Sequence, residues 1–205
     1  MSEPQVTSSA LDEETARADL YGLLAPLYYA APTPELLAAL QAAATQAPAE
    51  GSFLEAPWRA LVHTAQAMDV AEIAAEHEAL FGGLGKPEVY LFGSHYLSGF
   101  LNERPLALLR QDLAALGLAR DETLPDTEDH FACVCEVMRY LIAGDDVAVS
   151  NLSRQRTFFA VHVQPWAFKL CDALAAHERA RFYAALAGLT RAFMEVEQQG
   201  FDMLD

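Results

Sequence analysis

Apolar residues recur every three or four positions along most of this chain, which is the spacing of one face of an α-helix. The clearest example is the stretch 177–199, which predicts a wide core-facing stripe of Phe182, Leu186, Leu189 and Phe193. The 205 residues include 38 Ala and 29 Leu but only 13 Val and Ile together, so helix formers dominate. We therefore predict an all-α fold.

The pattern predicts a single globular domain of about eight to ten helices over 11–205, after a flexible segment 1–10. Thr33 followed by Pro34 predicts a helix start, and Asp69 with Glu72 predicts a capping box. Pro26 should kink or end the first helix. The predicted helices span 11–30, 34–47, 57–67, 69–81, 103–116, 127–143, 145–159, 164–175 and 177–199.

Two breaks interrupt the helical pattern. The first, near 82–100, begins with closely spaced glycines and continues as an aromatic stretch without a helical period, so it predicts a long apolar loop. Loops of about twenty residues in compact domains are usually functional or disordered, and this one is too apolar for disorder. The second break, 118–127, is a candidate hinge.

The charge balance excludes one class of partner. The chain carries 13 Lys and Arg against 29 Asp and Glu, a net charge of −16, and its cations are scattered. Nucleic acid binding needs a basic stripe that releases counterions, and an anionic membrane surface needs one as well. The longest apolar run, 21–31, is shorter than the roughly 20 residues that cross a bilayer. We expect neither nucleic acid binding nor stable membrane insertion.

The N-terminus and the cysteines indicate the compartment. Residues 1–5 show no basic region leading into an apolar core, so we find no secretory signal. The cysteines, Cys133, Cys135 and Cys171, are odd in number and fit a reducing compartment. We expect a cytoplasmic protein.

Motifs for catalysis or metal binding are missing. No His follows a Glu by three residues, and the chain has no His-Glu-x-x-His, no Cys-x-x-Cys and no phosphate loop. We expect no enzyme and no cofactor. Two alternatives stay open: a general protein-interaction module, or a helical metal protein or enzyme using dispersed His63, His77, His95 or His162.

Two clusters next to the breaks are candidate binding residues. Asp129 and His130 fall in the first turn of a predicted helix, where they are either a solvated helix start or a polar anchor at the rim of a groove. Leu80 and Phe81 end a predicted helix before the glycine break, where they either belong to the core or line a concave surface.

These clusters also carry a resemblance. The segment 78–87, followed by Ser94-His-Tyr96, resembles the Leu-Phe…Gly…Ser-x-Tyr signature of the TorD-like family of redox-enzyme maturation chaperones. The segment 124–130, followed by Glu136-Val-Met, resembles the second signature of that family, and 158–166 is similar to a third recurrent segment. The motifs occur in the order found in the family.

The resemblance implies an all-helical cytoplasmic chaperone. It would bind the twin-arginine leader or the apo-form of a molybdopterin-containing oxidoreductase, aid cofactor insertion and delay export. By position, the resemblance assigns peptide binding to Leu80, Phe81, Asp129 and His130, with Ser94 and Tyr96 as members of the loop signature. It also implies a monomer or a helix-swapped dimer.

The sequence departs from the family pattern around the Asp-His pair. Val134 stands where an earlier Glu is usual, which leaves Glu136, and Thr127-Glu128 is inserted between Pro125-Asp126 and Asp129. Either Asp126 or Asp129 therefore fills the role of the family aspartate. A leader offers two guanidinium groups beside an apolar stretch, and carboxylates beside an apolar groove are the matching acceptor.

Overall fold

The computed structural model describes residues 8–45, 53–82, 86–120 and 125–203. In this part of the chain every regular element is helical, and extended pairing is limited to one bridge between Phe92 and His130. The predicted all-α fold is confirmed. The elements are α1 (Ser8–Tyr29), α2 (Pro34–Ala42), α3 (Glu55–Gln66), α4 (Val70–Phe81), α5 (Gly93–Ser98), α6 (Arg104–Ala115), α7 (Phe131–Ala143), α8 (Leu152–Phe158), the π-helical turn η1 (Phe159–Val163), α9 (Gln164–Ala175) and α10 (Phe182–Asp202).

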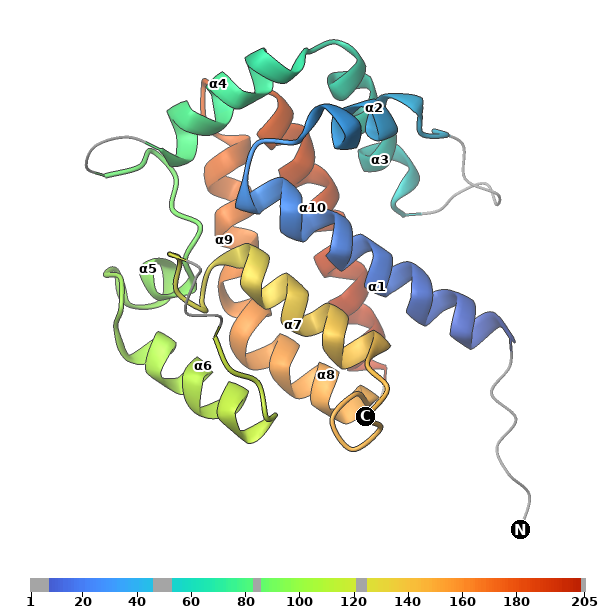
Figure 1. Cartoon of the computed structure of the whole chain (residues 1–205), viewed down its shortest axis with the longest axis vertical. Helices are drawn as coiled ribbons and strands as arrows, with labels where there is room; N and C mark the ends of the chain where they lie inside the picture. The colour runs from blue at the N-terminus through green and yellow to red at the C-terminus, as the bar shows by residue number, and fades with distance from the viewer. Residues whose placement is uncertain (1–7, 46–52, 83–85, 121–124, 204–205) are drawn as a thin grey trace.

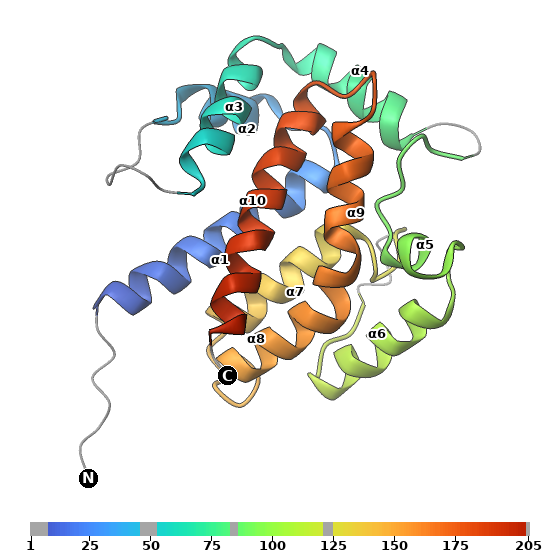
Figure 2. The ribbon, with the colours of Figure 1, turned by 180° about the vertical axis from the view of Figure 1, so that it is seen from behind.

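Helices α1, α7, α9 and α10 form the centre of the molecule. Helix α1 lies along α7, and α10 lies along α9 (Figure 1). Helices α2, α3 and α4 gather at one end of the molecule, where α3 packs against α10, and α5 and α6 cover one flank (Figures 1 and 2). The predicted stripe of Phe182, Leu186, Leu189 and Phe193 is buried in this core.

Local signals fixed several helix starts. The Thr33 hydroxyl accepts a hydrogen bond from the backbone N–H of Leu36, and Asp69 and Glu72 form the predicted capping box. Helix α1 includes Pro26 and ends at Tyr29, three residues later.

Other boundaries differ from the prediction because distant residues set them. Helix α10 begins at Phe182 rather than 177, because the buried Glu76 carboxylate on α4 accepts the backbone N–H groups of Arg181, Phe182 and Tyr183. Helix α7 begins at Phe131 rather than 127.

Two further segments differ from the prediction. The expected loop near 82–100 contains the short helix α5, and its residues 83–85 lie outside the described part of the chain. The same holds for residues 1–7 of the expected flexible N-terminus and for residues 121–124 of the expected hinge. The helix expected from 145 begins at Leu152 and continues through η1 into α9. Pro165 lacks an N–H and its ring crowds the carbonyl four residues earlier, which favours this wider turn.

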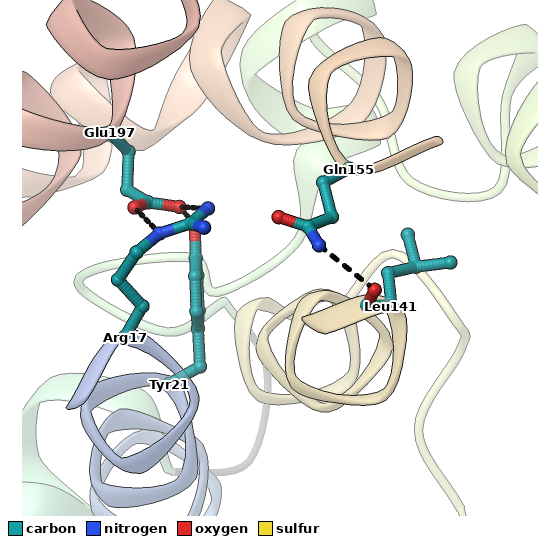
Figure 3. A network of polar contacts seen from close by, with 5 residues as sticks. All are labelled: Arg17, Tyr21, Leu141, Gln155 and Glu197. Carbon is teal, nitrogen blue, oxygen red and sulfur yellow. Dashed lines mark hydrogen bonds and ion pairs between the residues drawn. The ribbon is translucent and has the colours of Figure 1, made fainter. Parts of the chain in front are cut away.

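A buried polar cluster joins α1 to α10, the first and last helices. The Glu197 carboxylate on α10 accepts hydrogen bonds from the Arg17 guanidinium at 2.6 and 2.9 Å and from the Tyr21 hydroxyl at 3.0 Å (Figure 3). Nearby, the Gln155 amide donates to the backbone oxygen of Leu141, which links α8 to α7. These contacts fix α1, one wall of the site described next, against α10.

Candidate functional site

The two candidate motifs meet in one hydrogen-bonded junction. The backbone N–H of Phe131 donates to the Leu91 oxygen at 2.8 Å, and that of Gly93 donates to the Asp129 oxygen at 2.9 Å. The Asp129 carboxylate accepts the Ser94 backbone N–H at 2.8 Å and the Thr127 hydroxyl at 2.6 Å. Because Ser94 and Asp129 are buried, this junction fastens α5 to the start of α7.

His130 is the N-cap of α7 and is not a solvated surface residue. Its Nδ1 accepts the backbone N–H of Ala132 at 3.1 Å, and its ring packs edge-on against Tyr29 and Phe92. Burial lowers the pKa of His130 to about 4, although Asp126 and Asp129 oppose this shift. The imidazole is therefore neutral near pH 7, with its proton on Nε2.

The remaining loop-signature residues lie in aromatic packing. Leu80 is fully buried, and Phe81 is half-buried edge-on against Tyr183. The Tyr96 hydroxyl donates to the Tyr90 backbone oxygen at 2.9 Å, and its ring stacks on Trp166. None of these side chains lines the large groove described next.

A groove of about 640 Å³ runs between α1 and α7 and is closed by the end of α6 and the segment that follows it. Its lining is mainly apolar. The α1 wall is Gly22, Ala25, Pro26 and Tyr29, and the opposite walls include Leu113, Leu118, Val137 and Tyr140. A volume of this size accommodates several side chains of an extended or helical peptide.

Among the described residues, three carboxylates line the same groove: Asp126, Glu128 and Glu136. Glu128 accepts a bidentate hydrogen bond from Arg110 at 2.8–3.0 Å, and exposed Glu136 pairs with Arg139 at 3.2 Å. Half-buried Asp126 makes no hydrogen bond or ion pair within the described residues. An apolar groove with one unpaired carboxylate is suited to a cationic side chain that is flanked by apolar ones.

Four of the predicted site residues lie at two separate cavities. Asp126 and Glu136 line the groove, whereas Ser94 and Asp129 line a separate cavity of about 270 Å³ near α5 and α6. In that cavity the Ser94 hydroxyl is buried and lacks a hydrogen-bond partner.

Sequence reasoning missed the α1 wall of the groove. Pro26 was the one available signal, because a proline within an amphipathic helix removes an N–H and leaves the carbonyl four residues earlier, that of Gly22, without its usual donor. Both residues line the groove, so this irregular part of α1 belongs to its wall.

The histidines of the alternative metal site lie in separate environments. His77 packs against Phe81, His95 stacks on Tyr90, and His162 pairs with Asp112 at 2.7 Å. Among the described residues no three His, Cys, Asp or Glu side chains gather as a metal site would require. In the same part of the chain, each helix is too short or too polar to span a membrane.

Comparison with known proteins identifies the family. The sequence model of the family described as "Nitrate reductase delta subunit" matches residues 30–172, which is most of the chain. The chain belongs to this family. Chaperone protein TorD of Aliivibrio fischeri is 26% identical over 134 residues, and that of Vibrio cholerae is 26% identical over 140 residues. The predicted resemblance is confirmed.

The match to these relatives is partial. It covers 62% of this chain and 62% of the Aliivibrio protein, and 65% and 64% for the Vibrio protein, so the aligned part is less than two thirds of either relative. Both relatives are named as chaperones. The family match begins at residue 30, directly after α1 ends, and runs through α2 to α8 into α9, so it includes α6 and α7 but not the α1 wall of the groove.

Proposed function

We propose that this protein is a cytoplasmic chaperone for a molybdopterin-containing oxidoreductase, and that the groove between α1 and α7 binds the twin-arginine leader of that client. The observation that carries the proposal is the unpaired Asp126 carboxylate in the wall of a large apolar groove. A twin-arginine leader combines guanidinium groups with an adjoining apolar stretch, which is the matching ligand.

The groove provides a distinct place for each part of the leader. One guanidinium donates to Asp126, while apolar side chains pack on Tyr29, Leu118 and Val137. The net charge of −16 accelerates encounter with a basic segment and makes binding weaken with salt.

The role of the groove also suggests an order of events. A leader held in the groove is not accessible to the export machinery, so binding delays export while the apo-subunit acquires its cofactor. The chaperone then needs no cofactor and no catalytic step of its own. Asp129, His130 and Ser94 contribute by holding the segment that carries Asp126 and Glu128.

The test is a binding titration of the purified protein with the leader peptide of a molybdopterin oxidoreductase encoded in the same genome. Asp126→Asn should weaken binding by roughly tenfold or more, the size of a lost charge-assisted hydrogen bond. Asp145→Asn, which removes the same charge at an exposed position outside the groove, should leave binding nearly unchanged. Absence of saturable binding to the leader would overturn the proposal.

Two controls separate leader binding from other modes. A leader whose two arginines are replaced by alanine should bind Asp126→Asn and the unchanged protein equally weakly. Apo-enzyme lacking its leader should not compete for the groove; if it competes fully, the groove binds the mature client instead.

A further inference from the structure

Of the three groove carboxylates on described residues, two already pair with a guanidinium of this chain. Arg110, on α6, donates through Nε and Nη2 to both oxygens of Glu128 at 2.8–3.0 Å. Arg139, one turn along α7 from Glu136, pairs with that carboxylate at 3.2 Å. Each pair has the form that an arginine of a bound peptide would take.

In the Arg110–Glu128 pair, the Glu128 carboxylate is held in the groove wall, whereas the Arg110 guanidinium can move into solvent. The Glu128 side chain is 13% exposed and belongs to the groove wall, whereas the Arg110 side chain is 48% exposed. Burial by itself raises the pKa of Glu128, but the hydrogen bonds from Arg110 lower it below its usual value, so the carboxylate is charged. Releasing Arg110 into water sacrifices little packing, and exposed ion pairs are weak.

From this arrangement we infer that Arg110 is an internal competitor for Glu128, and that it sets the affinity of the groove for the second arginine of a leader. This inference rests on the proposed function. The first guanidinium takes the open Asp126, and the second replaces Arg110 on Glu128 in an exchange of one bidentate pair for another. When the peptide leaves, Arg110 returns to Glu128, so the Glu128 carboxylate does not stay unpaired and release is easier.

The experiment compares Arg110→Gln with Arg59→Gln. Arg59 is a matched control, because it is also 48% exposed and pairs with Glu55 on α3, outside the groove. Relative to Arg59→Gln, Arg110→Gln should tighten binding of the Arg-Arg leader by about two- to fivefold, the size of an exposed ion pair, mainly through slower dissociation. Arg139→Gln should give a smaller gain, since its pair is longer and Glu136 is 51% exposed.

A double-mutant cycle tests the mechanism. In a Glu128→Gln background the gain in leader affinity from Arg110→Gln should disappear, because the carboxylate for which Arg110 and the leader arginine compete is then absent. A leader with its second arginine replaced by alanine should gain less than about twofold in affinity from Arg110→Gln, because its remaining arginine binds Asp126, for which Arg110 does not compete. Urea unfolding of each variant confirms that the groove is intact.

The outcomes distinguish this inference from the function on which it rests. If the unchanged protein binds the leader but Arg110→Gln binds no tighter than Arg59→Gln, the inference is wrong and the proposed function stands. The same holds if the gain survives in the Glu128→Gln background. If no variant binds the leader, both fail.

Discussion

The Asp129 carboxylate accepts the backbone N–H of Ser94 at 2.8 Å, across 35 residues of sequence. Its second oxygen accepts the Thr127 hydroxyl, and both Asp129 and Ser94 are buried. Because the Asp129 carboxylate is buried and both of its oxygens already accept hydrogen bonds, we expect it to hold this junction rather than to receive a peptide arginine. We therefore interpret Asp129 as a positioning residue and Asp126 as the acceptor.

Asp129→Ala should lower the free energy of unfolding by about 1–3 kcal/mol, because it leaves the buried N–H of Ser94 without an acceptor. The measurement is urea denaturation. Asp126→Ala should change stability by less than about 0.5 kcal/mol, because the Asp126 side chain is only half-buried and makes no hydrogen bond within the described residues. If Asp129→Ala keeps full stability and abolishes leader binding, the two aspartates have the reverse roles.

Leu80→Ala should unfold the protein more readily rather than weaken binding directly. Leu80 is 0% exposed, and truncating a fully buried Leu typically lowers stability by about 2–5 kcal/mol. Leu108→Ala, at a position 43% exposed, should have little effect. Leader affinity measured well below the melting temperature should be the same for both variants; a selective loss in Leu80→Ala would place Leu80 at the binding surface.

Helices with local start signals were predictable, whereas those set by distant partners were not. Thr33 and Asp69 cap helices through residues three positions along, so sequence spacing alone reveals them. The start of α10 depends on Glu76, more than a hundred residues earlier, and no local pattern encodes that contact. Helix α5 was missed because six residues are too few to display a helical period.

The groove was predictable in its chemistry but not in its shape. A cluster of acidic residues at a predicted helix start suggested carboxylates beside an apolar surface. Asp126 and Glu136 line the groove, and their part in peptide binding stays a prediction. Sequence spacing does not show which aspartate turns inward, and Asp129 does so. The α1 wall comes from residues such as Tyr29, about a hundred positions away, so tertiary packing alone brings it there.

Glu197→Ala should be strongly destabilising. The Glu197 side chain is 2% exposed and accepts hydrogen bonds from Arg17 and Tyr21, whose hydroxyl stays protonated because burial raises its pKa (Figure 3). Removing one partner of a buried pair typically lowers stability by about 3–5 kcal/mol, and the partial exposure of Arg17 places the expected loss near the lower limit. Glu195→Ala, at a side chain 52% exposed, is the control and should change thermal stability little. Equal losses in the two variants would contradict a stabilising role for the cluster.

Acid should destabilise the protein partly through His130. Burial lowers its pKa in the folded state to about 4, whereas the pKa of an unfolded histidine is about 6.5. A depressed folded pKa gives stability that is complete above ~6.5 and is lost as the pH falls toward 4, since the unfolded chain binds the proton more tightly. Protonation of Nδ1 also removes the acceptor for the Ala132 N–H.

His130→Asn preserves an N-cap without titrating, so its free energy of unfolding should fall less steeply than that of the unchanged protein between pH 7 and 4.5. His63→Asn, at an exposed position, should follow the unchanged protein; a His130→Asn profile parallel to both would show that His130 does not carry this pH dependence.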